Sequence, residues 1–215
     1  MGGALLIAAV LWVVPTCPAH PARQGHVSSG LVGDVDGDGR PDRVVVRVVY
    51  SAPPHCALHL VVVPGRGRPL VAPLRPPALD RDGVRTAGWP RVVWLATIDG
   101  RPGAEIAFTD HLGASTAFLG VFTVRRHALV RMRVPRQDDV FPISPGTYFG
   151  GADCVGGLVV STTGELERSR VIVDRRFFRV VGTAFRLVRA RHYRLRALGH
   201  RFPELAYGEP AFSRC

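Results

Sequence analysis

The amino-acid sequence predicts an all-β fold built from antiparallel β-sheets. Short runs rich in Val, Ile, Phe and Thr recur along the chain, and Gly, Pro or Asp separates nearly all of them. No stretch shows the 3.6-residue periodicity of an amphipathic helix. With 215 residues, 47% of them hydrophobic, the chain is long enough to bury a core as one domain or as a tight array of repeats.

The expected strands follow one another between residues 43 and 189. They are Arg43–Tyr50, Leu58–Val63, Arg91–Ile98, Glu105–Thr109, Ala117–Val124, Leu129–Val134, Leu158–Thr162, Arg170–Val173, Phe177–Val181 and Phe185–Arg189. The many prolines of residues 64–90 predict a long loop with one short strand. Residues 199–215 predict an irregular tail.

The N-terminal segment has the pattern of a secretory signal peptide. Residues 1–19 carry no charged side chain and include the apolar run Ala4–Val14, which is too short to span a bilayer. Cys17 and Ala19 occupy positions −3 and −1 of a cleavage point. We therefore expect a secreted chain that begins near His20, with a lipid-anchored surface form as the less favoured alternative.

Removal of that segment leaves three cysteines, Cys56, Cys154 and Cys215. In an oxidising compartment we expect Cys154 to pair with Cys215, which would tie the C-terminal residue to the body of the fold. Three pairings are open, and Cys56 is also compatible with a buried free thiol because it begins the apolar stretch CALHLVVV.

One loop concentrates negative charge in a chain of formal net charge +11. The nine residues 34–42 read DVDGDGRPD, with aspartates at alternate positions and a strand-like run directly after them. Oxygen ligands at alternate positions of a tight loop suit Ca²⁺, whose charge would offset the repulsion between the carboxylates. The predicted metal ligands are the side chains of Asp34, Asp36, Asp38 and Asp42 and the backbone carbonyl of Arg40. The alternative is a solvated Asp-Gly turn that binds no ion.

This loop does not match an EF-hand, because the twelfth position is Val45 and a β-branched run follows. Gly33–Asp42 followed by RVVV instead resembles the calcium loop of FG-GAP or VCBS-type repeats, the β-propeller blades of integrin α-subunits and of many secreted bacterial proteins. The resemblance covers some fifteen residues. It implies antiparallel blades of a partial β-propeller with two to three units, and a calcium ion held by the five residues named above.

A second, degenerate copy of the loop lies downstream. The segment 95–108, LATIDGRPGAEIAF, aligns with LVGDVDGDGRPDRVVV if two residues are deleted from the loop. Asp99 and Glu105 alone cannot fill a calcium shell, so we expect a turn of similar shape without the ion. The spacing suggests repeat units at 27–88, 89–145 and 146–215 within a single domain 20–215.

The positive charge comes from arginine alone, since the chain contains no lysine. The densest cluster lies in residues 186–196, RLVRARHYRLR, where arginine alternates with apolar residues as on a half-solvated strand. A positive surface concentrates polyanions such as nucleic acid or a cell-wall polymer. The residues that would carry this binding are Arg186, Arg189, Arg191, Arg194 and Arg196.

The sequence contains no nucleophile elbow, HExxH helix, Walker loop or GxGxxG motif. Asp110, His111 and Ser115 are close in sequence, but we interpret them as a polar hairpin turn. We therefore expect a secreted, non-catalytic β-repeat protein with one structural calcium site, acting as an extracellular or cell-surface interaction module. The alternatives are an arginine-rich polyanion-binding protein and, below it, a secreted hydrolase with an unrecognised site.

Overall fold

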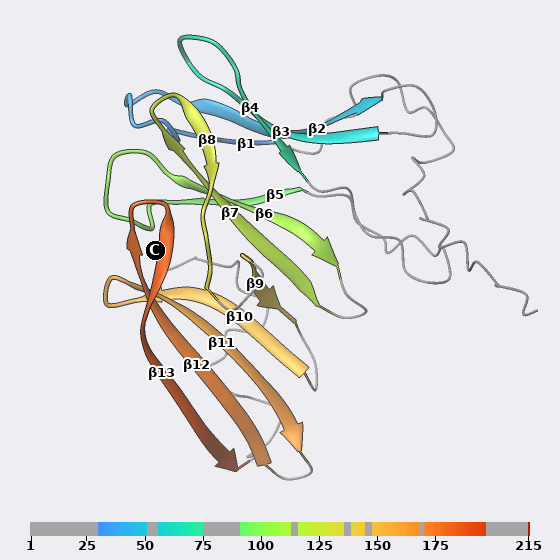
Figure 1. Cartoon of the computed structure of the whole chain (residues 1–215), viewed down its shortest axis with the longest axis vertical. Coiled ribbons are helices and arrows are strands. Elements are labelled where there is room, and N and C mark those ends of the chain that lie inside the picture. The colour runs from blue at the N-terminus through green and yellow to red at the C-terminus, as the bar shows by residue number, and fades with distance from the viewer. Residues whose placement is uncertain are drawn as a thin grey trace, which may run out of the picture.

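The computed structural model describes residues 30–50, 56–74, 91–112, 116–135, 139–144, 148–167, 170–196 and 215. Over these residues the protein is all-β, as the sequence predicts, and its strands form three antiparallel sheets (Figure 1). The expected signal segment, residues 1–19, lies outside the described part of the chain. No helix among the described residues is long and apolar enough to cross a membrane.

In each sheet, four consecutive strands pair in sequence order as a meander. The first sheet contains β1 (Leu31–Gly33), β2 (Asp42–Tyr50), β3 (Cys56–Val63) and β4 (Leu70–Leu74). The middle sheet contains β5 (Val92–Ala96), β6 (Glu105–Leu112), β7 (Ala117–Arg125) and β8 (Ala128–Arg131), with β9 (Phe141–Ile143) paired to β7. The third sheet contains β10 (Tyr148–Val155), β11 (Leu158–Glu167), β12 (Arg170–Val181) and β13 (Ala184–Arg196).

The middle sheet packs on both of its faces (Figure 1). One hydrophobic cluster joins it to the first sheet through Ile106, Phe108 and Phe122, while Ala107 belongs to a second cluster that joins it to the third sheet. Because successive side chains of a strand point to opposite faces, β6 needs apolar residues at consecutive positions to serve both clusters. Its run Ile106 to Phe108 meets that need.

Three strands were missed by the sequence prediction. The strands β1 and β9 are only three residues long, and β10 begins YFGG, a glycine-rich sequence with low strand propensity. In the structure Phe149 of β10 lies opposite Gly164 of β11, and a Cβ on Gly164 would stand 2.1 Å from the Phe149 ring. The strand is thus stabilised by an aromatic ring packed over a partner glycine.

The predicted strands Arg170–Val173 and Phe177–Val181 are one continuous strand, β12. The intervening Asp174, Arg175 and Arg176 read as a break in the sequence, but each pairs with a residue of β11 and a residue of β13. Backbone pairing on both sides carries the strand through this charged stretch.

The predicted disulfide between Cys154 and Cys215 is confirmed, with a Cα–Cα distance of 4.9 Å. It ties the last residue of the chain to β10. A disulfide of this kind is typical of proteins that reside in oxidising compartments. The side chain of Cys56 lies outside the described part of the structure.

Candidate metal centre

The acidic loop connects β1 to β2. Gly33, the last residue of β1, pairs with Asp42, the first residue of β2, so the loop closes at its base. Gly37 and Gly39 have φ angles of 82° and 80°, which side-chain-bearing residues rarely adopt. These two glycines let residues 34–42 fold back tightly enough to bring the aspartates together.

Asp42, at the start of β2, holds the loop in place through hydrogen bonds. Its side chain is fully buried, and its Oδ2 accepts hydrogen bonds from the backbone N–H groups of Val35 (2.9 Å) and Asp36 (3.3 Å). Its Oδ1 accepts a third from the N–H of Gly65, in the turn after β3 (3.0 Å). Three donors compensate much of the cost of burying this carboxylate.

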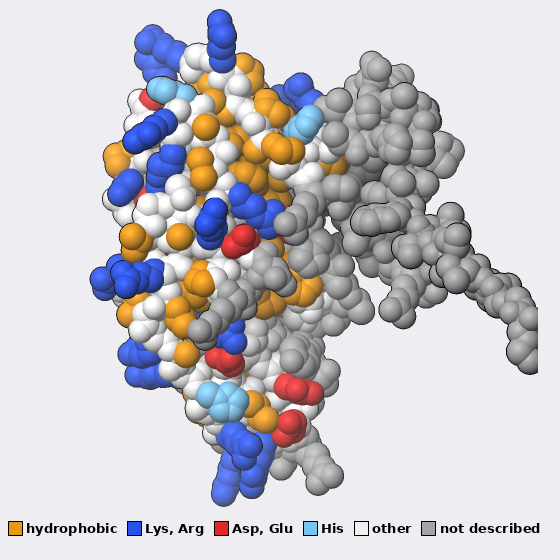
Figure 2. All heavy atoms as spheres, in the orientation of Figure 1, with side chains coloured by type: hydrophobic (Ala, Val, Ile, Leu, Met, Phe, Trp, Pro, Cys, Tyr) orange, Lys and Arg blue, Asp and Glu red, His pale blue; other side chains and the backbone are white. Residues whose placement is uncertain are grey.

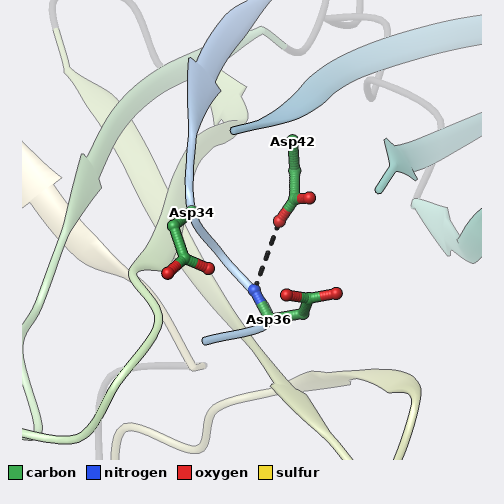
Figure 3. A group of neighbouring side chains, drawn as sticks. All are labelled: Asp34, Asp36 and Asp42. Carbon is green, nitrogen blue, oxygen red and sulfur yellow. Dashed lines mark hydrogen bonds between the residues drawn. The ribbon is translucent and has the colours of Figure 1, made fainter. Parts of the chain in front are cut away.

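Asp34 and Asp36 complete the cluster. Asp34 accepts hydrogen bonds from the N–H groups of Gly37 (2.7 Å) and Gly39 (2.9 Å), while Asp36 accepts one from Asp38 (3.1 Å). Carboxylate oxygens of Asp34, Asp36 and Asp42 all lie within 4.8 Å of one another. Figure 3 shows the three side chains converging from the two ends of the loop. The group can hold a metal ion.

No cationic side chain neutralises this group among the described residues. No arginine or histidine of the described chain forms an ion pair with Asp34, Asp36 or Asp42. Burial raises the pKa of Asp36; the hydrogen bond from Asp38 opposes this, and the charges of the neighbouring carboxylates raise the pKa further. An all-oxygen, negatively charged donor set of this kind suits a hard divalent cation.

The structure brings together three of the five predicted ligands. Asp38 does not belong to the converging group, and its Oδ1 accepts a hydrogen bond from the N–H of Arg40 at 2.8 Å. Asp38 therefore stabilises the turn of the loop through its side chain.

A second loop with the same strand register connects β5 to β6. Ala96 pairs with Glu105 as Gly33 pairs with Asp42, and in both cases the two residues are nine positions apart. Glu105 accepts a hydrogen bond from the N–H of Ile98 (2.8 Å), as Asp42 does from Val35. The two loops therefore align without a gap at an offset of 63 residues, and the two-residue deletion assumed from the sequence is wrong.

The second loop contains its own counter-charge. Asp99, which corresponds to Asp36, forms a hydrogen-bonded ion pair with the guanidinium of Arg125 at the end of β7. The same nitrogen lies 3.8 Å from Oε1 of Glu105, which also accepts a hydrogen bond from the hydroxyl of Thr123 at 3.1 Å. A guanidinium thus bridges the two acids of this loop. The sequence analysis did not identify Arg125 as a partner of these acids. The feature that could have indicated it is its position at the end of β7, the strand that pairs with β6.

The two loops touch each other. The N–H of Ala104 donates to the backbone carbonyl of Asp34 at 2.8 Å. A Cβ on Gly37 would lie 2.8 Å from the carbonyl oxygen of Pro102, and a Cβ on Gly103 would lie 2.9 Å from that of Val35. Glycine at both positions allows this close backbone approach.

Two other acidic positions of the chain have structural partners. Asp110 is buried and pairs with Arg131 at 2.7 Å. Oδ1 of Asp139 accepts a hydrogen bond from the N–H of Val134 at 2.8 Å. The side chain of His111 and the whole of Ser115 lie outside the described residues.

The arginines of residues 186–196 lie on β13 and all are exposed. Strand register divides them between the two faces of the third sheet. Arg186, Arg189 and Arg191 lie opposite Arg179, Phe177 and Arg175 on one face, and Arg194 and Arg196 lie opposite Ile172 and Arg170 on the other.

Comparison of this chain with family models, with curated proteins and with solved structures finds no match.

Proposed function

We propose that this chain is a secreted, non-catalytic β-repeat protein whose loop 34–42 binds one structural calcium ion. The observation that carries the proposal is the convergence of Asp34, Asp36 and Asp42 within 4.8 Å, with no cationic partner among the described residues. The equivalent loop, which holds Arg125 against two acids, supports the same conclusion. A nearby positive charge lowers the repulsion between acids in this turn, and in the first loop a cation from solution would supply it.

Calcium suits the donor set better than the softer transition metals, because every candidate ligand is oxygen. Asp34, Asp36 and Asp42 form the centre of the site. By resemblance to FG-GAP calcium loops, the carboxylate of Asp38 and the carbonyl of Arg40 complete it. Extracellular calcium is near millimolar, so even a weak site would be occupied there.

The ion has a mechanical role in this proposal. It would hold the loop residues Asp34 and Asp36 against Asp42, and therefore fix β1 relative to the start of β2. Because the loop also contacts the turn before β6, the ion would stiffen the junction between the first and middle sheets. A rigid stack of sheets outside the cell suits an interaction module for an extracellular protein or polysaccharide, which is a role we infer from the family resemblance.

The test is thermal unfolding of the protein in EDTA, in about 2 mM Ca²⁺ and in the same concentration of Mg²⁺. If calcium is present at tenfold its Kd, it should stabilise the fold by about 1.4 kcal/mol and raise the midpoint by roughly 3 to 6 °C. Asp36→Asn should abolish this rise, because it removes one of the charged ligands. The side-chain oxygen of the asparagine can still accept the hydrogen bond from the Asp38 N–H, so the turn itself should be kept.

The matched control is Asp153→Asn in β10, whose Oδ1 accepts from the neighbouring N–H of Cys154. It removes the same charge outside the loop and should keep the full response to calcium. Equal midpoints in EDTA and calcium for the unmodified protein would exclude a structural calcium site.

A further inference from the structure

One face of the third sheet gathers arginines from two neighbouring strands. The pairs Arg175↔Arg191, Phe177↔Arg189 and Arg179↔Arg186 place these side chains on the same face, because residues directly opposite in a sheet point the same way. Residues two apart on a strand stand about 6.8 Å apart, and neighbouring strands about 4.8 Å. We call this set the arginine face: Arg175, Arg179, Arg186, Arg189 and Arg191.

No acid in the part of the chain that the structure describes lies close to the arginine face. An ion pair of this sheet, Arg176 with Asp174, lies on the opposite face, and so do the carboxylates of Glu165 and Glu167. Asp153 is on the same face but two strands away, on β10. Among the described residues, none of the five arginines forms an ion pair. Figure 2 shows arginine side chains along the edge and lower end of the molecule, where β12 and β13 lie.

Phe177 holds three of these charges together. The guanidinium carbons of Arg175, Arg189 and Arg191 lie 5.4, 4.1 and 6.0 Å from the centre of its ring. Cation–π attraction of about 0.5–1 kcal/mol each offsets part of their mutual repulsion. Phe177 is 5% exposed, so its ring is covered and cannot stack on a nucleobase.

Four of the five arginines are exposed, and Arg175 is half-buried. Guanidinium groups bind phosphate oxygens through paired N–H donors, and they suit repeated anionic groups when several stand in rows. A compact, single-anion pocket would need buried donors, whereas here the charges spread over two strands. This arrangement matches an extended polymer better than a small molecule.

We propose that the arginine face binds a linear polymer of phosphate groups, recognised by charge and not by its bases. The shared chemistry is a repeated phosphate, whether it belongs to a nucleic acid or to a non-nucleotide polymer. Because the aromatic ring is covered, a polymer without bases should bind as well as single-stranded DNA of equal charge. This binding is independent of the calcium loop and persists in EDTA.

The experiment measures binding of fluorescent inorganic polyphosphate, and of single-stranded DNA of matched charge, as a function of salt concentration. Five neutralised phosphates give a slope of about −3.5 in log K against log salt, so affinity should fall about 100-fold between 50 and 200 mM salt. The triple variant R186Q/R189Q/R191Q should reduce that slope to about −1.4. At 50 mM salt it should bind at least tenfold more weakly.

The matched control is R170Q/R194Q/R196Q, which removes three charges from the same two strands on the opposite face. It should keep at least half of the affinity and the full salt slope. A second variant, R179Q/R186Q, keeps the three arginines that lie over Phe177. It should still weaken binding about threefold or more, and it tests the arginine face even if the triple variant does not fold. Far-ultraviolet circular dichroism checks each fold.

Equal losses for the two triple variants would overturn the proposal, because binding would then depend on net charge and not on this face. A preference for DNA above tenfold over polyphosphate would also overturn it, since recognition would require bases. So would weak binding of both polymers at 50 mM salt.

Discussion

The loops that follow β1 and β5 have the same strand register and manage their buried acids in different ways. In both, an acid at the first position of the next strand is buried, Asp42 at 0% and Glu105 at 2% exposed, and accepts a hydrogen bond from a loop N–H. The second loop adds the guanidinium of Arg125, which bridges Asp99 and Glu105. The first loop has three clustered carboxylates and no arginine partner among the described residues.

The comparison separates two roles that the sequence motif combines. The buried acid at the strand start is a structural hydrogen-bond acceptor, and it is needed whether or not a cation is present. The acids in the loop itself add negative charge, and their neutralisation differs between the two copies. In the middle sheet a side chain from β7 supplies the charge, and in the first sheet we propose that calcium does.

The largest expected effect is that of Asp42→Ala. This change leaves three backbone N–H donors without their acceptor, so we expect a loss of about 4 kcal/mol in the free energy of unfolding. Urea unfolding in EDTA measures it, because calcium then contributes nothing. Asp38→Ala is the control: its exposed carboxylate accepts one hydrogen bond, and its loss should stay below about 1 kcal/mol. Similar losses for both variants would contradict the anchoring role.

Arg125→Met should cost about 3 kcal/mol, because it removes the guanidinium that contacts both buried carboxylates and leaves Asp99 only the exposed Arg101, at 3.9 Å. Urea unfolding in EDTA and in calcium checks the prediction. Calcium should not restore the loss, since two carboxylates cannot fill a calcium shell. A calcium-induced stabilisation larger than that of the unmodified protein would mean that the second loop also accepts a divalent ion. The two loops would then differ only in the cation that neutralises their acids.

Gly37→Ala tests the contact between the loops. Its φ of 82° and the carbonyl of Pro102 at 2.8 Å both oppose a Cβ, so we expect a loss of about 2 kcal/mol. Gly39→Ala is a matched control because its φ is 80° but nothing lies within 4 Å of the new Cβ. It should cost about 1 kcal/mol. Thermal unfolding of both variants gives the difference, and equal losses would show that the contact contributes nothing.

The smallest effect concerns pH. Burial is the main reason that the pKa of Glu105 is raised; hydrogen bonds from Ile98 and Thr123 and the charge of Arg125 oppose it, and that of Asp99 adds to it. An acid whose pKa is higher in the folded state stabilises the fold below its unfolded pKa, and this contribution is lost as pH rises through the folded pKa.

Glu105→Gln removes that titration and keeps an oxygen for the Ile98 N–H. The stability of the variant relative to the unmodified protein should therefore improve as pH rises from about 4 to 7. Urea unfolding at several pH values measures the difference. Glu167→Gln, at an exposed position of β11, should show no such trend. A constant difference for Glu105→Gln would contradict the raised pKa.

Much of this fold follows from the local sequence. Runs such as RVVVRVVY and RVVWLATI predict strands because β-branched residues favour the pleated conformation, and Gly and Pro mark their ends. The acidic loop is recognisable for a similar reason, since alternate aspartates followed by glycine and a strand form a local pattern. The strand β10 escaped prediction because its stability comes from Phe149 packed over Gly164 of the neighbouring strand.

The sequence by itself determined that the chain is all-β and that acids cluster between residues 34 and 42. These properties depend on strand propensity and residue spacing, which act over a few residues. The pairing of Cys154 with Cys215 was one of three that the sequence left open, and the structure selects it. Only the tertiary structure decided that Arg125 serves the loop after β5 and that the β13 arginines divide between two faces. Both depend on strand register, because a shift of one residue reverses the face that every side chain occupies.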